Sequence, residues 1–211
     1  MSANLSLYLA SKSPRRKEIL EQLGFSPIVI ASNDHTLRNF KGDEEQLPGE
    51  SPEDYVVRIA REKALIAFEK IRRENRPMLP ILSADTTVIV DRDILGKPDN
   101  EQEAYSFLER LSGRVHEVRT AICVGTSENN LKQAVSISEV RFKNLTQEEI
   151  SAYVRTAQPY DKAGGYGIQG LAGAFISEIK GSYSGIMGLP VFETCELLKS
   201  FGLDLFKRQV R

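Results

Sequence analysis

Residues 7 to 20 read LYLASKSPRRKEIL, and this stretch decides the class of fold. The apolar run at residues 7–10 is typical of a buried strand. Ser13 has the character of a helix N-cap, and Pro14 stands at the first helical position, which proline favours. A strand that leads through a short turn into a helix indicates a protein that mixes both kinds of element.

The first turn of this helix contains an electrostatic conflict. A capping box would place Glu or Gln three residues after Ser13, but Arg16 stands there, with Arg15 before it in the first turn and Lys17 after it. Cations at this end face the positive pole of the helix dipole, at a cost of roughly 0.3–1 kcal/mol each at low salt. A bound phosphate would turn the conflict into attraction, because helix-start N–H groups and guanidiniums both bind it. The alternative is two solvated arginines on an exposed turn.

Strands and helices alternate irregularly along the rest of the chain. This pattern predicts one α/β domain over residues 1–211, with a mixed twisted sheet flanked by helices and two lobes with a central cleft. The polar stretch at 32–50 is either a functional loop or locally disordered. The expected strands lie at 27–31, at two segments within 79–96, at 115–125, 131–142 and 173–181, and the expected helices at 51–74, 99–113, 145–156 and 188–202.

Composition is that of an ordinary globular protein. The chain has 211 residues, of which 41% are hydrophobic and 27% charged, with a formal net charge of −1. This charge argues against a large nucleic-acid interface. No apolar run approaches the ~20 residues that span a bilayer, and no secretory signal is visible, so the location expected by default is cytoplasmic. Cys123 and Cys195, and likewise His35 and His116, are too scattered to indicate a metal site.

Two charged residues interrupt apolar patterns. Lys63 points along the apolar stripe of the helix at 51–74, so it either snorkels at the edge or delivers an ammonium into a cleft. Asp85 interrupts the strand-like ILSADTTVIV, where an ionised carboxylate is costly unless it is paired or bound to metal. Asp85 is therefore a candidate metal ligand or general base, with a cap or turn residue as the alternative.

Two glycine-containing segments carry further candidates. ILGKP places Lys97 beside Gly96, where it can serve as a phosphate cation. QPYDKAGGYGIQG, at residues 158–170, interleaves four clustered glycines with Lys162, Tyr166 and Gln169. Glycine permits close backbone approach to a ligand, tyrosine can stack on a base and glutamine can read a base edge. A flexible surface loop is the alternative. Together with the cations and the acid, this loop indicates a nucleotide-handling enzyme.

An ordered set of motifs resembles the Maf family of nucleotide pyrophosphatases over about residues 5 to 200. The motifs are LASKSPRRKEIL, REKA, SADTTVIV, GKP, LSGRVHEVRTA, DKAGGYGIQG and GSYSGIMGLPVFET. The resemblance implies an elongated fold related to house-cleaning inosine triphosphate pyrophosphatases. It also implies metal-dependent hydrolysis of a nucleoside triphosphate between the α- and β-phosphates. Ala84-Asp85-Thr86 and Gln169 resemble the branch that prefers dTTP and UTP.

The resemblance also implies roles for individual residues. Asp85 is the implied general base and a metal ligand, for Mg²⁺ or Mn²⁺. The implied base-specificity residues are Arg15, Thr86 and Gln169, the implied phosphate contacts are Ser11, Arg16, Lys63 and Lys97, and Lys162 and Tyr166 are loop contacts. The family usually has an acidic pair after the second strand, whereas this chain has Asp34 followed by His35. Asp34 is therefore a weaker candidate for the metal.

Several alternatives stay open from sequence. Hydrolysis of 7-methyl-GTP or of a broad range of nucleotides would keep the chemistry and change only the base pocket. The alternative to an enzyme is a non-catalytic regulator of septum formation that binds nucleotide or nucleic acid. The expected partner is the nucleoside triphosphate substrate, without a membrane and without nucleic acid. A homodimer is implied by the resemblance alone.

Overall fold

The structure is a computed structural model that describes residues 5–30 and 45–208. The chain divides into two compact units, in agreement with the two lobes expected from sequence. Unit 1 is formed by residues up to 85 with 121–135 and the residues from 188 onward, and unit 2 by 86–120 and 136–187. In the described part of the chain, no helix is long and apolar enough to cross a membrane.

Seven strands of the described residues form one mixed sheet with the order β2-β1-β3-β5-β6-β7, and β4 pairs with β3. The strands are β1 (Ser6–Ala10), β2 (Ser26–Val29), β3 (Ile81–Val90), β4 (Asp93–Leu95), β5 (Val115–Ser127), β6 (Asn130–Phe142) and β7 (Ile176–Lys180). The helices are α1 (Pro14–Gln22), α2 (Pro52–Arg73), α3 (Glu101–Leu111), α4 (Gln147–Val154), α5 (Tyr183–Ile186) and α6 (Val191–Ser200), with short 3-10 helices η1 (Ala163–Gly165), η2 (Leu171–Phe175) and η3 (Phe206–Arg208). The mixed sheet flanked by helices confirms the predicted fold class.

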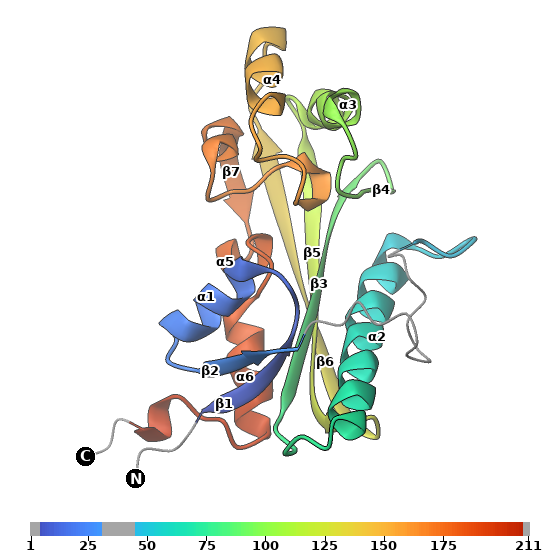
Figure 1. The fold of residues 1–211 in the computed structure, drawn as a ribbon. Coiled ribbons are helices and arrows are strands. Elements are labelled where there is room, and N and C mark those ends of the chain that lie inside the picture. The colour runs from blue at the N-terminus through green and yellow to red at the C-terminus, as the bar shows by residue number, and fades with distance from the viewer. Residues whose placement is uncertain (1–4, 31–44, 209–211) are drawn as a thin grey trace. The chain divides into compact units, whose positions relative to one another are not determined.

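Unit 1 is built on parallel strands. β1 pairs in parallel with β2 on one side and with β3 on the other. The chain therefore passes from β1 to β2 in one direction and returns to β3 in the other. Since crossover connections are right-handed, α1 and α2 cover opposite faces of these strands, as Figure 1 shows.

The helix α2 begins where the sequence predicts. The side chain of Ser51 accepts a hydrogen bond from the backbone N–H of Asp54 at 3.1 Å, and Pro52 stands in the first turn. Acidic residues follow in the first turn and basic residues occupy the last, both with the sign that the helix dipole favours. The apolar stripe, which includes Val56, Ile59 and Ala60, is buried. Cap, dipole and stripe all agree, so the boundaries were predictable.

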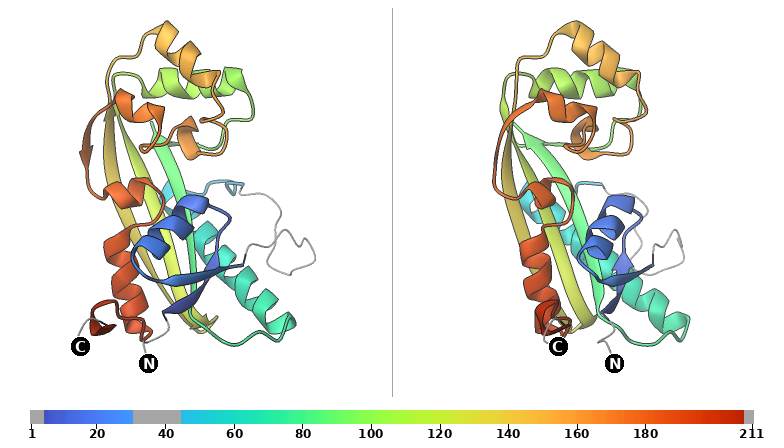
Figure 2. Two further views of the ribbon diagram at one scale, coloured as in Figure 1. Left: turned by 60° about the vertical axis from the view of Figure 1, so that its left-hand side comes forward. Right: turned by 90° about the vertical axis from the view of Figure 1, so that its left-hand side faces the viewer.

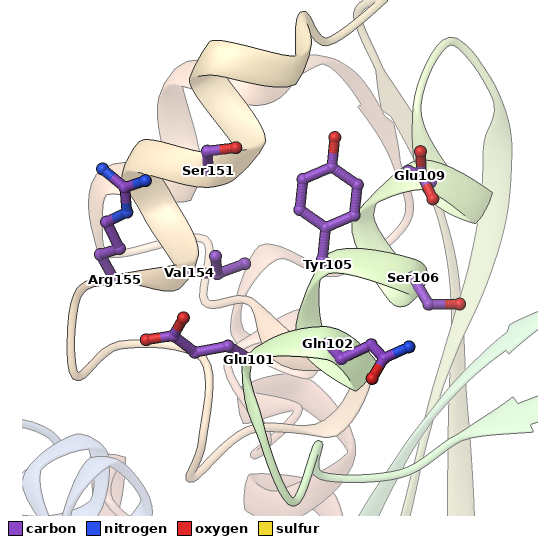
Figure 3. A pocket seen from close by; sticks show the side chains of 8 residues that line it. All are labelled: Glu101, Gln102, Tyr105, Ser106, Glu109, Ser151, Val154 and Arg155. Carbon is purple, nitrogen blue, oxygen red and sulfur yellow. The ribbon is translucent and has the colours of Figure 1, made fainter.

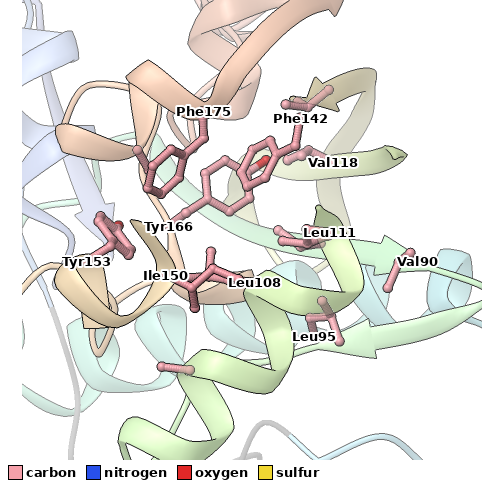
Figure 4. Packing of buried hydrophobic residues seen from close by; sticks show 14 of the residues in the cluster. Val90, Leu95, Leu108, Leu111, Val118, Phe142, Ile150, Tyr153, Tyr166 and Phe175 are labelled. Carbon is pink, nitrogen blue, oxygen red and sulfur yellow. The ribbon is translucent and has the colours of Figure 1, made fainter. Parts of the chain in front are cut away.

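Unit 2 has an aromatic and aliphatic core (Figure 4). The rings of Phe142 and Tyr166 meet edge to face with their centroids 4.9 Å apart, and Phe175 packs against Phe142 at 6.1 Å. Leu108 and Leu111 of α3 are completely buried in this cluster. In both views of Figure 2, α3 and α4 lie side by side. This packing places η1 against α3.

Candidate functional site

The register of the parallel strands places Asp85 just past the carboxyl end of β1. Ala10, the last residue of β1, is opposite Ser83 of β3. Asp85 therefore extends two positions past the end of β1, beside the turn that leads into α1. In open α/β sheets ligands bind at the carboxyl ends of the strands. Asp85 lies inside the ten-residue strand β3, which continues past the end of its parallel neighbour β1.

Lys63 and Asp85 form an ion pair in unit 1. The Lys63 ammonium donates a hydrogen bond to Oδ1 of Asp85 at 2.7 Å. The side chain of Asp85 is 7% exposed and that of Lys63 is 25% exposed. The pairing explains how β3 tolerates a carboxylate, because a buried charge requires a partner. One turn before Lys63, the carbonyl of Ala60 accepts a hydrogen bond from the Ser83 hydroxyl at 2.6 Å, which fixes α2 against β3.

Arg16 is buried and bound to the protein's own oxygens. Its Nε donates to the carbonyl of Gly188 at 2.7 Å. Its Nη1 donates to the carbonyl of Ala84 at 2.8 Å and to the hydroxyl of Ser11 at 3.0 Å. Ala84 directly precedes Asp85, so the guanidinium fixes the backbone next to the candidate base. The phosphate contacts expected of Arg16 and Ser11 stay predictions, and these bonds give both residues a further, structural role.

The same contacts resolve the conflict in the first turn of α1. Ser13 is the N-cap residue of this helix, but its side chain makes no capping hydrogen bond. Instead its backbone N–H donates to the Ser11 hydroxyl at 3.2 Å. The side chain of Arg16 leaves the helix start and turns inward to carbonyl dipoles, while Arg15 is half-buried on α1. Of the two arginines, Arg16 therefore has its charge compensated by dipoles of the fold itself.

In unit 2, a backbone hydrogen bond joins the two glycine-containing loops. The N–H of Gly164 donates to the carbonyl of Gly96 at 2.9 Å. Lys97 is exposed next to this bond, and Lys162 lies half-buried on the other loop. The Lys162 ammonium donates to the carbonyl of Gln158 at 2.7 Å and pairs with the Asp161 carboxylate. The structure thus brings two of the predicted cation-bearing segments together.

Thr86 and Gln169 also belong to unit 2. Thr86 lies on the same face of β3 as Val88, since side chains alternate along a strand. A Cβ at Gly164 would lie 2.9 Å from Cγ1 of Val88, so the η1 turn covers this face closely. Thr86 is half-buried there, and Gln169 is exposed a few residues after η1.

Tyr166 differs from its expected role. Sequence suggested a ring that stacks on a base, but the residue is 5% exposed and belongs to the core of unit 2. Its hydroxyl lies 2.6 Å from Nε2 of His116. Burial lowers the pKa of His116 to about 4 and raises the pKa of Tyr166. The pair is a neutral, buried hydrogen bond, and we assign Tyr166 no ligand contact.

The metal prediction rests on Asp85. In residues 5–30 and 45–208, no three His, Cys, Asp or Glu side chains gather into a metal-binding group. The other candidate, Asp34, lies outside the described residues, as does His35. A Mg²⁺ ion is often held by one or two carboxylates and completed by substrate phosphates. A single carboxylate at the strand ends fits that pattern.

A hollow of ≈ 530 Å³ lies elsewhere in unit 2, between α3 and α4 (Figure 3). Glu101 and Glu109 line it together with a single arginine, Arg155. None of the residues predicted from sequence lines it. The excess of carboxylates would repel a polyphosphate, so this hollow is not the candidate site.

The fold and the site define an α/β protein with a carboxylate–ammonium pair at the carboxyl ends of parallel strands. A family model described as Maf-like protein matches residues 6–201, and the chain belongs to this family. A dTTP/UTP pyrophosphatase of Pasteurella multocida is 49% identical over 207 residues, which cover 96% of this chain and 99% of that protein. A dTTP/UTP pyrophosphatase of Bordetella avium is 51% identical over 199 residues, which cover 94% and 96%. Among solved structures, the Staphylococcus aureus Ham1 protein has a TM-score of 0.44 at 12% identity and covers 65% of this chain and 71% of its own.

Sequence reasoning missed the residues that contribute only a backbone carbonyl, and the residues that contact another candidate residue from a neighbouring strand. The carbonyls of Ala84 and Gly188 bind Arg16, and backbone oxygens leave no trace in residue type. Thr120 contacts Thr86 from the neighbouring strand β5. Its place in the motif LSGRVHEVRTA was the one available signal, but a threonine in a strand is too common to stand out.

Proposed function

We propose that the protein hydrolyses dTTP and UTP to the nucleoside monophosphate and pyrophosphate. The ion pair between Lys63 and Asp85, 2.7 Å apart at the carboxyl ends of parallel strands, is the observation that carries this proposal. The names of relatives at about half identity over nearly the whole chain support it.

Asp85 and Lys63 have separate roles in the proposed reaction. Asp85 takes a proton from the attacking water as the water oxygen bonds to phosphorus and the bridging P–O bond between the α- and β-phosphates breaks. Lys63 carries three N–H donors, so it can keep Asp85 and still reach a phosphate oxygen. Pyrophosphate leaves with the electrons of the broken bond, and cations stabilise the charge on the phosphoryl oxygens.

A divalent metal, Mg²⁺ or Mn²⁺, would be held by Asp85 together with substrate phosphates. When bound, it neutralises phosphate charge. Ser11, Arg16 and Lys97 are the further phosphate contacts that we propose, and Lys162 adds a cation from the glycine-rich loop. Arg15, Thr86 and Gln169 would read the base.

A panel of nucleoside triphosphates with Mg²⁺ or Mn²⁺, followed by pyrophosphate release, tests the proposal. We expect dTTP and UTP to be preferred over purine nucleotides, CTP and 7-methyl-GTP. Asp85→Asn removes the base and should lower kcat by roughly 10²–10⁴-fold. Binding of nucleotide to this variant should stay measurable.

Asp93→Asn is the matched control, because it changes the same side chain on β4, where Asp93 pairs with Arg110 at 2.7 Å. It should keep the wild-type rate. Folded protein that releases no pyrophosphate from dTTP or UTP would refute the activity. An Asp85→Asn variant with full rate would refute only the assignment of the base.

The homodimer and the cytoplasmic location stay predictions. Light scattering on the purified protein measures the first and cell fractionation the second. A salt-sensitive interaction with DNA in a filter-binding titration would instead favour the regulator of septum formation.

A further inference from the structure

A chain of hydroxyl groups leads away from Thr86 into the core of unit 2. The Oγ1 atoms of Thr86 and Thr120 are 2.9 Å apart. Thr120 is completely buried, and its hydroxyl donates to the carbonyl of Gly185 at 2.8 Å. Three elements, β3, β5 and α5, thus contribute one group each to a short hydrogen-bonded relay.

The direction of this relay is fixed by proton counting. A threonine hydroxyl has one proton to donate and two lone pairs to accept with, and a carbonyl can only accept. The single proton of Thr120 is committed to Gly185. The contact between the two threonines is therefore a hydrogen bond only if Thr86 is its donor. Because its one proton is used in this bond, the Thr86 oxygen can only accept a hydrogen bond from any further neighbour.

The carbonyl that sets this direction is itself held in place. The N–H of Gly185 donates to the Ser182 hydroxyl at 2.9 Å, which caps α5. The N–H of Ser182 in turn donates to Ser138 of β6 at 3.0 Å. A side chain at Gly185 would meet the Ser136 hydroxyl at 2.9 Å. The end of the relay is therefore anchored to the sheet.

We propose that Thr120 is a positioning residue that sets base preference by making Thr86 a hydrogen-bond acceptor. The inference rests on the proposed function, in which Thr86 reads the base. Uracil and thymine carry an N–H at ring position N3, which an acceptor oxygen can bind. Cytosine carries a lone pair at the same position and would face the Thr86 oxygen without a proton between them, which is unfavourable when buried.

Thr120→Val tests the proposal, because it keeps the shape of the side chain and removes the hydroxyl. Thr86 can then turn its proton toward the base and accept cytosine. We expect the ratio of kcat/KM for UTP to that for CTP to fall about tenfold, with a gain on CTP as well as a loss on UTP. Thr120→Ser restores the hydroxyl and should restore the preference.

Thr87→Val is the matched control. Thr87 is the next residue on β3, points to the opposite face and is buried, and its hydroxyl has no hydrogen-bond partner among the described residues. The substitution is the same, but it leaves the relay intact. The ratio of UTP to CTP turnover should therefore not change.

The outcomes separate the inference from the proposed function. Wild-type protein without dTTP or UTP turnover refutes the function. If the wild-type protein prefers UTP to CTP and folded Thr120→Val shows the same ratio of the two kcat/KM values, only the inference is refuted. If Thr120→Val does not fold, N3-methyl-UTP tests the wild-type protein directly. It lacks the N–H and should be turned over at least about tenfold less well than UTP, and equal turnover would overturn the proposal.

Discussion

The two arginines at the start of α1 show how a local rule breaks for a tertiary reason. In sequence both oppose the helix dipole. In the structure Arg16 crosses to carbonyls of residues far along the chain, at 2.7 Å from Gly188 and 2.8 Å from Ala84. Charge-assisted hydrogen bonds of this kind are stronger than neutral ones. They outweigh the dipole cost of roughly 0.3–1 kcal/mol.

Arg16 should therefore affect the rate more than substrate binding. Because the guanidinium fixes Ala84 beside Asp85, Arg16→Ala should lower kcat by roughly 10²-fold on every nucleotide, and the loss of its proposed phosphate contact should raise KM by a smaller factor. Arg16→Lys should not rescue the rate, since an ammonium lacks the planar fork that serves several carbonyls. Steady-state kinetics over the nucleotide panel measure both effects.

Arg15→Ala is the comparison for Arg16, because it removes the same side chain one residue earlier. It should change which nucleotide is preferred. If Arg16→Ala raises KM and leaves kcat intact, its main role is direct phosphate binding. Equal losses across the panel for both variants would erase the distinction between the two arginines.

For the helices and strands, the capping residues and apolar stripes could be predicted from sequence, but the contacts made with other elements could not. Thr146 and Glu149 form a capping box at the start of α4, and Gly113 follows α3 with a positive φ of 69°. Both signals are contained in neighbouring residues. The length of β3 was harder to predict from sequence, because a carboxylate such as that of Asp85 is unfavourable inside a buried strand. In the structure Lys63, on α2, pairs with this carboxylate.

The η1 turn depends on glycine at one position above all. Gly164 has a φ of 68°, and a Cβ there would lie within 3.0 Å of three Val88 atoms. Gly164→Ala should therefore destabilise the protein by about 2–4 kcal/mol, from left-handed backbone and overpacking together. Thermal or urea unfolding measures the loss.

Gly49→Ala separates the two causes. Gly49 has a φ of 77°, and nothing lies within 4 Å of a Cβ built there. This variant should lose only the backbone term, about 1 kcal/mol. Equal losses for both variants would mean that the contact with Val88 relaxes without cost.

For the whole molecule, sequence predicted the class of fold and proposed a set of candidate residues. It could not predict which residues lie next to one another. Tyr166 illustrates the difference: a tyrosine in a glycine-rich loop has the composition of a ligand contact, but the fold buries it against Phe142 and His116. Whether a side chain faces ligand or core depends on long-range packing, which the residue type does not record.

The buried His116 should make the stability of the whole molecule depend on pH. Burial lowers its pKa from 6.5 to about 4 in the folded protein. Between these values the unfolded chain binds a proton that the folded protein does not. The contribution of the neutral His116 to the free energy of unfolding is therefore complete above about pH 6.5 and is lost as the pH falls toward about 4. By about pH 5 the free energy of unfolding should have dropped by about 2 kcal/mol.

His116→Gln isolates this effect, because glutamine can still hydrogen bond to the Tyr166 hydroxyl but does not titrate in this range. Urea unfolding at about pH 7.5 and about pH 5 measures both proteins. Every other titrating group is common to the two, so the difference between their pH slopes belongs to His116. The wild-type protein should lose about 2 kcal/mol more than the variant over this interval. Parallel slopes would show that the imidazole accepts a proton in the folded state as readily as in the unfolded chain.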